Sequence, residues 1–276
     1  MNALPPHYAL PPPLPGGRNA ESPHEALLGE VSTLRSIGFL QRGVQRAASV
    51  ARLRITFSAS RIRYGTAVRI GEDLLLTCHH VLFDWARGNA PAMGAVAWFN
   101  YQQDADGNSL PVESYRTLPQ TLAGDRDQDW AVLRTTCPVA EDFPALDLGS
   151  PIPLIEGARI YIVQHPGGGP KKITLDRNQV THLNDRMIHY RAETEAGSSG
   201  APIFDEAWSL VAIHQGWQRV ATATGTAIVN QGLRIEGIAS SLQALGLLDA
   251  ASGHAPPRSA DPAGSPSSPA PIHAIH

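Results

Sequence analysis

Three short stretches of the chain carry residue types that could act together on a carbonyl group. The stretch TCHHVL at 77–82 offers imidazoles, DQDWAVL at 127–133 offers carboxylates beside an apolar run, and GSSGAP at 197–202 offers hydroxyls between small residues. A general base, an acid that orients it and a nucleophile are the groups that nucleophilic catalysis requires. Each stretch is unspecific by itself, and their order along the chain is the informative feature.

The third stretch offers a nucleophile, Ser199, between Ser198 and Gly200. A serine hydroxyl is a weak nucleophile, so it needs a turn that also aims backbone N–H groups at a developing oxyanion. Gly197 can adopt a positive φ without steric cost, which lets its N–H point the same way as that of Ser199. We therefore expect Gly197 and Ser199 to form an oxyanion hole.

The first stretch offers two candidate bases at the end of the apolar run DLLLTC. His80 is followed by Val81-Leu82, so it should be held at the edge of a sheet rather than in solvent. His79 is its immediate neighbour, and only one of the two can face Ser199 because adjacent residues point different ways. Their pairing alone does not separate them.

The second stretch offers an acid at the start of a buried strand. Asp129 directly precedes Trp130-Ala131-Val132-Leu133. A buried carboxylate needs hydrogen-bonding partners, and an imidazole N–H is the expected one. Asp125 and Asp127 lie nearby but are more typical of loop residues.

Short strand patterns bounded by Gly, Pro, Asp or Asn fill the chain from Val50 to about Gly232, with no long helix between them. This regular spacing favours an all-β sandwich or pair of barrels. The strand patterns are RLRITF, YGTAVRI, DLLLTC, GAVAWFN, WAVLRT, ARIYIVQ, SLVAIHQ and TGTAIVN.

Four segments are expected along the chain. Residues 1–21 form a Pro-rich disordered arm, and residues 22–48 form a helical segment with Ser22 as its cap and Leu27, Val31 and Leu34 as an apolar stripe. Residues 49–248 form the β domain, which ends in a helix between Leu233 and Leu247. Residues 249–276, rich in Pro, Ser and Ala, form a disordered tail.

Composition excludes several classes of protein. The net charge is −3 and 17% of the residues are charged, which argues against a nucleic-acid or anionic membrane partner. The chain has no apolar run long enough for a transmembrane helix and no signal-type N-terminus. Its two cysteines, Cys78 and Cys137, are interpreted as free thiols, so we expect a cytoplasmic protein. We expect no metal and no cofactor, and His273 and His276 are interpreted as tail residues.

The segment from about Tyr64 to Ile238 resembles the chymotrypsin-like serine peptidases, especially their compact bacterial branch. YGTAVRIGEDLLLTCHHVL is similar to that branch's strand, turn, strand and histidine, DWAVL to its acid-bearing strand, and GSSGAPIF to its nucleophile turn. The resemblance implies two six-stranded antiparallel β-barrels, with an N-terminal and a C-terminal helix added here. It also implies a catalytic triad of His80, Asp129 and Ser199, because the histidine directly before Val is the catalytic one.

The resemblance gives a mixed indication of substrate specificity. Thr194 and His214 stand where glutamyl endopeptidases bind an acidic substrate side chain, and an imidazolium and a hydroxyl suit a carboxylate. Glu193 stands where trypsin-like members place the acid that binds Arg or Lys, and it would repel such a carboxylate. With Gly216, these residues are the predicted S1 pocket. An acidic or polar P1 residue is favoured over a basic one.

The residue before the nucleophile bears on activation. Animal digestive members place there an acid that pairs with a new N-terminal ammonium, whereas this chain has Ser198. Activation of that kind is therefore disfavoured, and the N-terminal segment is the candidate site for a regulatory protein partner. The predicted function is a regulated intracellular bacterial serine endopeptidase that acts on protein or peptide substrates. The alternative is a catalytically silent protease fold used as a binding module.

Overall fold

The computed structural model describes residues 34–148, 153–222 and 225–248. The chain divides into two units, Met1–Ile37 and Gly38–His276, and every helix and strand given below belongs to the second. The predicted arm at 1–21, the first part of the predicted helical segment at 22–33 and the tail at 249–276 lie outside the described residues.

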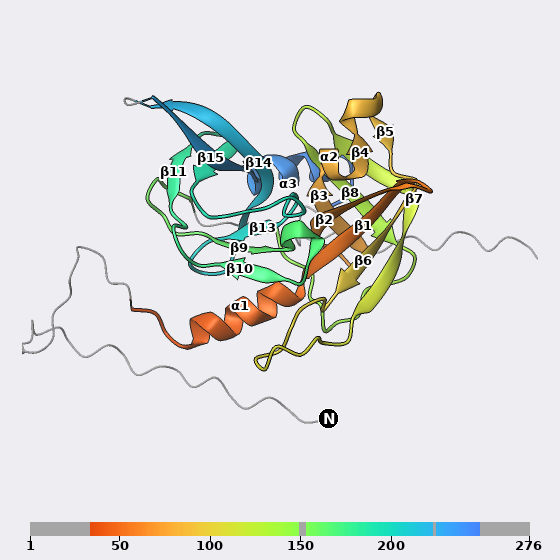
Figure 1. Cartoon of the computed structure of the whole chain (residues 1–276), viewed down its shortest axis with the longest axis horizontal. Coiled ribbons are helices and arrows are strands. Elements are labelled where there is room, and N and C mark those ends of the chain that lie inside the picture. The colour runs from red at the N-terminus through yellow and green to blue at the C-terminus, as the bar shows by residue number, and fades with distance from the viewer. Residues whose placement is uncertain (1–33, 149–152, 223–224, 249–276) are drawn as a thin grey trace, which may run out of the picture. The chain divides into compact units, whose positions relative to one another are not determined.

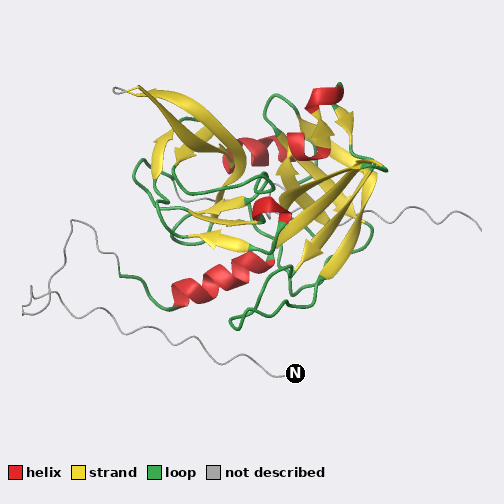
Figure 2. Ribbon diagram, in the orientation of Figure 1, coloured by secondary structure: helices red, strands yellow, loops and turns green. Residues whose placement is uncertain are grey.

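Six antiparallel strands form a closed barrel, in the order β1-β2-β3-β8-β7-β6 (Figures 1 and 2). Its interior is built from the apolar residues of the strand patterns, such as Leu53, Val68 and Leu75, which are fully buried. The strands are β1 Val50–Ser58, β2 Arg61–Arg69, β3 Leu74–Cys78, β6 Gly94–Phe99, β7 Glu113–Asp125 and β8 Trp130–Thr135. A small two-stranded sheet, β4 Phe83–Asp84 and β5 Ala90–Pro91, follows β3.

A second antiparallel sheet has seven strands, in the order β10-β9-β13-β14-β15-β12-β11. The strands are β9 Tyr161–Gln164, β10 Lys172–Thr174, β11 Val180–Leu183, β12 Met187–Tyr190, β13 Pro202–Phe204, β14 Leu210–Thr222 and β15 Gly225–Arg234. Hydrogen bonds between 157–160 and 178–180 join the segment before β9 to β11, so the sheet curls back on itself. The predicted double-barrel fold is confirmed, with seven strands rather than six in the second sheet.

Two longer helices flank the sheets. Helix α1 spans Gly38–Ala48, inside the predicted helical segment 22–48, and Leu34 lies outside this helix. Phe39 of α1 packs on Tyr161 and Trp208 of the second sheet region, with ring centroids 5.0 and 5.1 Å away. The C-terminal helix α3 spans Ile235–Ala244, inside the predicted range.

The remaining helical elements of the described residues are short: α2 His79–Leu82, η1 Trp85–Arg87 and η2 Pro166–Gly168. None of the described helices has the length and apolar character needed to cross a membrane.

Direct hydrogen bonds join the barrel to the second sheet near GSSGAP. The main-chain N–H of Thr66 in β2 donates to the carbonyl of Ser199 at 2.9 Å, and its hydroxyl donates to the carbonyl of Gly197 at 2.8 Å. The thiol of Cys78, at the end of β3, donates to the carbonyl of His214 in β14 at 3.2 Å. These bonds fix the third sequence stretch against the first.

Candidate active site

The turn from β3 into α2 sets the two histidines in different surroundings. His79 is buried, its Nδ1 accepts a hydrogen bond from the indole N–H of Trp85 at 2.8 Å, and its ring stacks on Phe83 at 3.9 Å. Burial lowers the pKa of His79. His80 is partly exposed and lines a cleft with Ser199. Local packing thus occupies His79 and leaves the ring of His80 available.

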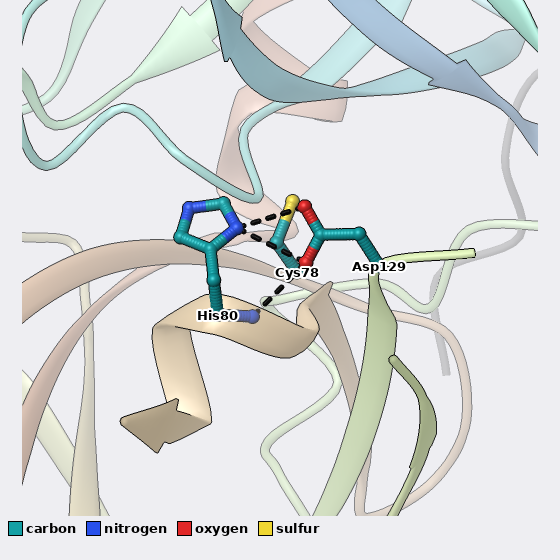
Figure 3. Close-up of side chains that lie close together, drawn as sticks. All are labelled: Cys78, His80 and Asp129. Atoms are coloured by element: carbon teal, nitrogen blue, oxygen red, sulfur yellow. Dashed lines mark hydrogen bonds and ion pairs between the residues drawn. The ribbon is translucent and has the colours of Figure 1, made fainter. Parts of the chain in front are cut away.

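Asp129 and His80 meet through the imidazole and through the backbone. Nδ1 of His80 lies 2.9 and 3.0 Å from the two carboxylate oxygens, and its main-chain N–H donates to Oδ1 at 3.0 Å (Figure 3). A carboxylate can only accept hydrogen bonds, so the ring proton of His80 lies on Nδ1. Nε2 of His80 is then left as an acceptor. Gln215 completes the set by donating to Oδ2 of Asp129 at 2.8 Å.

The backbone of Asp129 is unusual, with φ of 55° just before β8 begins. The loop before it is a turn in which Asp125 accepts the main-chain N–H of Gln128 at 2.9 Å, and Asp129 donates its own N–H to the carbonyl of Arg126. Left-handed backbone is uncommon for a residue with a side chain and indicates that the surroundings impose it. Here the conformation brings the buried carboxylate toward α2, while Asp125 shapes the loop.

The loop bearing Ser199 leaves two N–H groups free. Within the described ranges, the N–H groups of Gly197 and Ser199 donate to no protein acceptor. The neighbouring carbonyls are held elsewhere, that of Gly197 by Thr66 and that of Ala196 by the N–H of Gly167 at 2.6 Å. The N–H of Ser198 between them donates to the carbonyl of Glu195 at 3.0 Å. Two unengaged N–H groups beside a hydroxyl are the parts of an oxyanion hole.

Two glycines in this loop have no room for a side chain. Gly197 has φ of +96°, and a Cβ there would lie 2.7 Å from the main-chain nitrogen of Gly168. Gly200 has φ of +86°, and a Cβ there would clash with Thr77 and with the carbonyl of Thr66. The loop therefore packs directly onto backbone, which fixes its shape.

Behind this loop lies a second group of residues that the sequence patterns did not single out. The guanidinium of Arg52 lies over the rings of Trp98, Tyr101 and Tyr64 at 3.8, 4.4 and 4.7 Å, and it donates to the carbonyl of Gly168 at 2.8 Å. Because residues 167 and 168 contact the loop at 196–197, Arg52 braces the candidate oxyanion hole from the barrel side. The sequence signal for this group is a charged residue inside the strand pattern RLRITF, on the face opposite the core residue Leu53.

His165 begins the same supporting turn. It is fully buried, and its Nδ1 lies 2.9 Å from the carbonyl of Gly169. Burial lowers its pKa to about 3. A neutral imidazole therefore fills the space below the turn.

The hydroxyl of Ser199 is engaged by a main-chain carbonyl rather than by the His80 ring. It donates to the carbonyl of Gln215 at 3.4 Å, and no hydrogen bond joins it to His80 among the residues that the structure describes. Both side chains nevertheless line one cleft, of about 890 Å³. Such hydrogen bonds are often loose without substrate and tighten on binding.

All four residues of the predicted S1 pocket line this cleft: Glu193, Thr194, His214 and Gly216. His214 is buried, its Nδ1 lies 2.6 Å from the hydroxyl of Tyr190, and burial lowers its pKa to about 3. The expected imidazolium is therefore a neutral imidazole in the structure, with Nε2 left for a substrate group.

Several other residues that line the cleft were not predicted from the sequence. Arg191 is exposed beside Glu193, and Trp217 and Ile228 are exposed apolar side chains. Asn230 pairs with Trp217 across β14 and β15 and donates to the carbonyl of Ala192 at 2.6 Å. These residues meet through strand register, which the sequence does not display.

Cys78 lies beside the dyad without taking part in it. Its side chain is fully buried, and burial together with the Asp129 carboxylate raises the pKa of its thiol. Figure 3 shows the sulfur next to the Asp129 carboxylate and the His80 ring.

The chain was compared with known proteins. Residues 65–213 match the model of the trypsin-like peptidase domain. The chain is similar to the uncharacterized protein y4fB of Sinorhizobium fredii (31% identity, 69% of this chain and 31% of that protein) and to glutamyl endopeptidase of Staphylococcus aureus (23%, 61% and 47%). It thus spans a third to a half of the length of these relatives.

A likeness to solved structures supports the fold. The Rv3671c protease of M. tuberculosis in its active form superposes with a TM-score of 0.56 at 18% identity, over 83% of this chain and 99% of that one. The family match covers more than half of the chain and includes β3, α2, β8 and the loop at 197–200. The chain therefore belongs to the trypsin-like peptidase family.

Proposed function

We propose that the chain is a serine endopeptidase that works through a covalent acyl-enzyme. The observation that carries this proposal is the double contact between His80 and Asp129 in the same cleft as Ser199 and the unengaged N–H groups beside it. A nucleophile, a base held in one tautomer and an oxyanion site are the three requirements of this chemistry.

Each step follows from this geometry. Rotation of the Ser199 side chain brings Oγ from the Gln215 carbonyl to Nε2 of His80. Oγ then bonds to the substrate carbonyl carbon while its proton passes to Nε2. The resulting oxyanion accepts hydrogen bonds from the N–H groups of Gly197 and Ser199. The imidazolium, stabilised by the Asp129 carboxylate, next gives this proton to the leaving amine as the C–N bond breaks. Water, deprotonated by His80, cleaves the ester and restores Ser199.

A fluorophosphonate reagent tests the proposal without knowledge of the substrate. We expect it to label the wild-type chain at Ser199 and to label Ser240→Ala equally, since Ser240 is an exposed serine of α3. Ser199→Ala should not be labelled. Failure to label the folded wild-type chain at any pH would instead favour a silent binding module.

We further propose that the cleft accepts an acidic or polar P1 side chain. Thr194 and the free Nε2 of neutral His214 supply hydrogen bonds, and Arg191 adds a positive charge that offsets Glu193. The similarity to a glutamyl endopeptidase is consistent with this assignment.

Peptides that differ only at P1 test this specificity. Glu193→Gln should raise kcat/KM for a Glu substrate, because it removes a like charge, whereas Glu113→Gln on the distant β7 should not. A preference for Lys or Arg that disappears in Glu193→Gln would contradict the assignment.

We also propose that the peptidase acts inside a bacterial cell under the control of a protein partner that binds the N-terminal segment. Helix α1 presents Leu40 and Val44 as exposed apolar side chains, which supports a docking role, and both cysteines are free thiols. Exchange of Leu40 and Val44 for Ser removes this apolar surface and keeps the packing of Phe39 on Trp208. Unchanged activity of this variant, alone and in bacterial extract, would argue against control through α1.

A further inference from the structure

One chemically active group near the proposed triad has no role in the mechanism above. The Cys78 sulfur, a ring nitrogen of His80 and a carboxylate oxygen of Asp129 all lie within 4.8 Å of one another (Figure 3). Among the described residues this is the one group of three or more His, Cys, Asp or Glu side chains close enough to hold a metal ion.

The distances between these atoms, none above 4.8 Å, lie within a small shift of those in a tetrahedral site. Zinc binds sulfur at about 2.3 Å and nitrogen or oxygen at about 2.0 to 2.2 Å, so ligand atoms lie roughly 3.3 to 3.8 Å apart. The Nδ1–Oδ2 distance of 2.9 Å is that of a hydrogen bond. An ion could replace the shared proton if these two atoms separated by about half an ångström.

The charges of the three ligands also suit a divalent ion. A thiolate and a carboxylate together balance a charge of +2, which matters because Cys78 and Asp129 are buried. Thiolate is a soft ligand and imidazole suits zinc, so this donor set selects thiophilic ions over Mg²⁺ or Ca²⁺.

We propose that Cys78, His80 and Asp129 form a binding site for a thiophilic divalent cation, Zn²⁺ or Cd²⁺, and that the bound ion switches the peptidase off. The binding part stands on the geometry alone, whereas the inhibition part rests on the proposed serine peptidase function.

The proposed inhibition follows from the proton balance of the site. The incoming ion displaces the thiol proton of Cys78, which is released to solvent. It also takes the place of the proton on Nδ1 of His80, so the neutral ring carries its proton on Nε2. That nitrogen can then no longer accept the proton of Ser199, and the nucleophile is not activated.

Ultraviolet absorption during titration with Cd²⁺ tests the binding part directly, since a thiolate–cadmium bond has a charge-transfer band. The key variant is Cys78→Ser, which fills the same space and can still donate to the His214 carbonyl. Cys78→Ala is a second variant in case the first fails to fold. Cys137→Ser is the matched control, because it removes the exposed thiol and keeps the buried one.

We expect the band in wild type and in Cys137→Ser, and its loss in Cys78→Ser. With Zn²⁺ and a peptide substrate, the inhibition constant should weaken at least about tenfold in Cys78→Ser, since loss of even an outer-shell partner costs that much affinity.

Two results would overturn the site: absence of the band in wild type, or equal Zn²⁺ inhibition with and without Cys78. The band with no peptidase or labelling activity in metal-free wild type would keep the metal site and reject the proposed function. Peptidase activity in metal-free wild type with no cadmium band would support the proposed function and reject the metal site.

Discussion

Asp129 accepts two hydrogen bonds from His80, one from the ring at 2.9 Å and one from the main-chain N–H at 3.0 Å. The carboxylate thus holds both the orientation of the imidazole and the first turn of α2, which carries it. Its third donor, Gln215, comes from the other sheet.

Asp129→Asn should keep the fold and lose most of the activity. An amide can direct its NH₂ at Nδ1 and so favour the wrong tautomer, and kcat should fall by about 10⁴-fold. Steady-state kinetics measures this, with circular dichroism as the check on folding. Activity within about tenfold of wild type would mean that Asp129 does not set the tautomer.

The two neighbouring histidines should respond very differently to substitution. His80→Gln should lower kcat by a factor on the order of 10⁶, the cost of losing a triad base. His79→Gln can still accept the indole N–H of Trp85, so kcat should stay within about tenfold of wild type, a barrier change under about 1.4 kcal/mol. Equal losses in both variants would contradict the assignment of separate roles.

Arg52 should act as a positioning residue through the turn at Gly168. Arg52→Lys keeps the charge but loses the planar stacking, and it should cost about 1 to 3 kcal/mol of unfolding free energy. We expect kcat to fall by about tenfold with little change in KM, less than the ~10²-fold or greater loss of a direct oxyanion donor. Arg54→Lys on the same strand is the control. A loss of stability with unchanged kcat would limit Arg52 to a structural role.

Gly200→Ala should be strongly destabilising. The left-handed backbone at φ of +86° costs about 1 to 2 kcal/mol for a residue with a side chain, and the clash with Thr66 and Thr77 adds about 1 to 3 kcal/mol. Urea unfolding measures the sum. Gly94→Ala, where a Cβ meets no atom within 4 Å, serves as the control. A variant as stable as wild type would show that the loop can move away from the barrel.

Two buried histidines should make the fold sensitive to acid. Burial lowers the pKa of both His165 and His214 from 6.5 to about 3, so between these values the unfolded chain binds more protons than the folded one. Stability therefore rises with pH across this window, by up to about 1.4 kcal/mol per pH unit for each group. In His165→Gln the slope of unfolding free energy against pH should fall by one proton. An unchanged slope would mean that His165 is protonated in the folded state.

The sequence predicted the residues whose role depends on local chain order, and missed those brought together by register. TCHHVL, DWAVL and GSSGAP each sit where a strand ends or begins, so their positions could be inferred from pattern alone. Arg191 and Asn230 reach the cleft through the pairing of β12, β14 and β15, including the irregularity between His214 and Gly216. No local pattern encodes that pairing.

The missed strands have a related cause. β7 is half-exposed along most of its length, and β10, β11 and β12 have only three or four residues each, so none shows a clear alternation. Among the described residues of the predicted N-terminal segment, Gly38–Ala48 form α1, and its Phe39 and Gly43 pack closely on Trp208. Neither residue belongs to the predicted apolar stripe, because this contact is made with a part of the chain far away in sequence.

The hairpin of β14 and β15 carries both kinds of cleft residue. His214 and Trp217 line the substrate cleft, while Gln215 between them donates to Asp129 and accepts from Gln231 at 2.8 Å. The side chains that we propose to contact the substrate and the side chain that holds Asp129 are therefore neighbours on one strand. Any exchange of this hairpin for one with another specificity, in evolution or by design, must keep Gln215 in register or lose turnover together with the old preference.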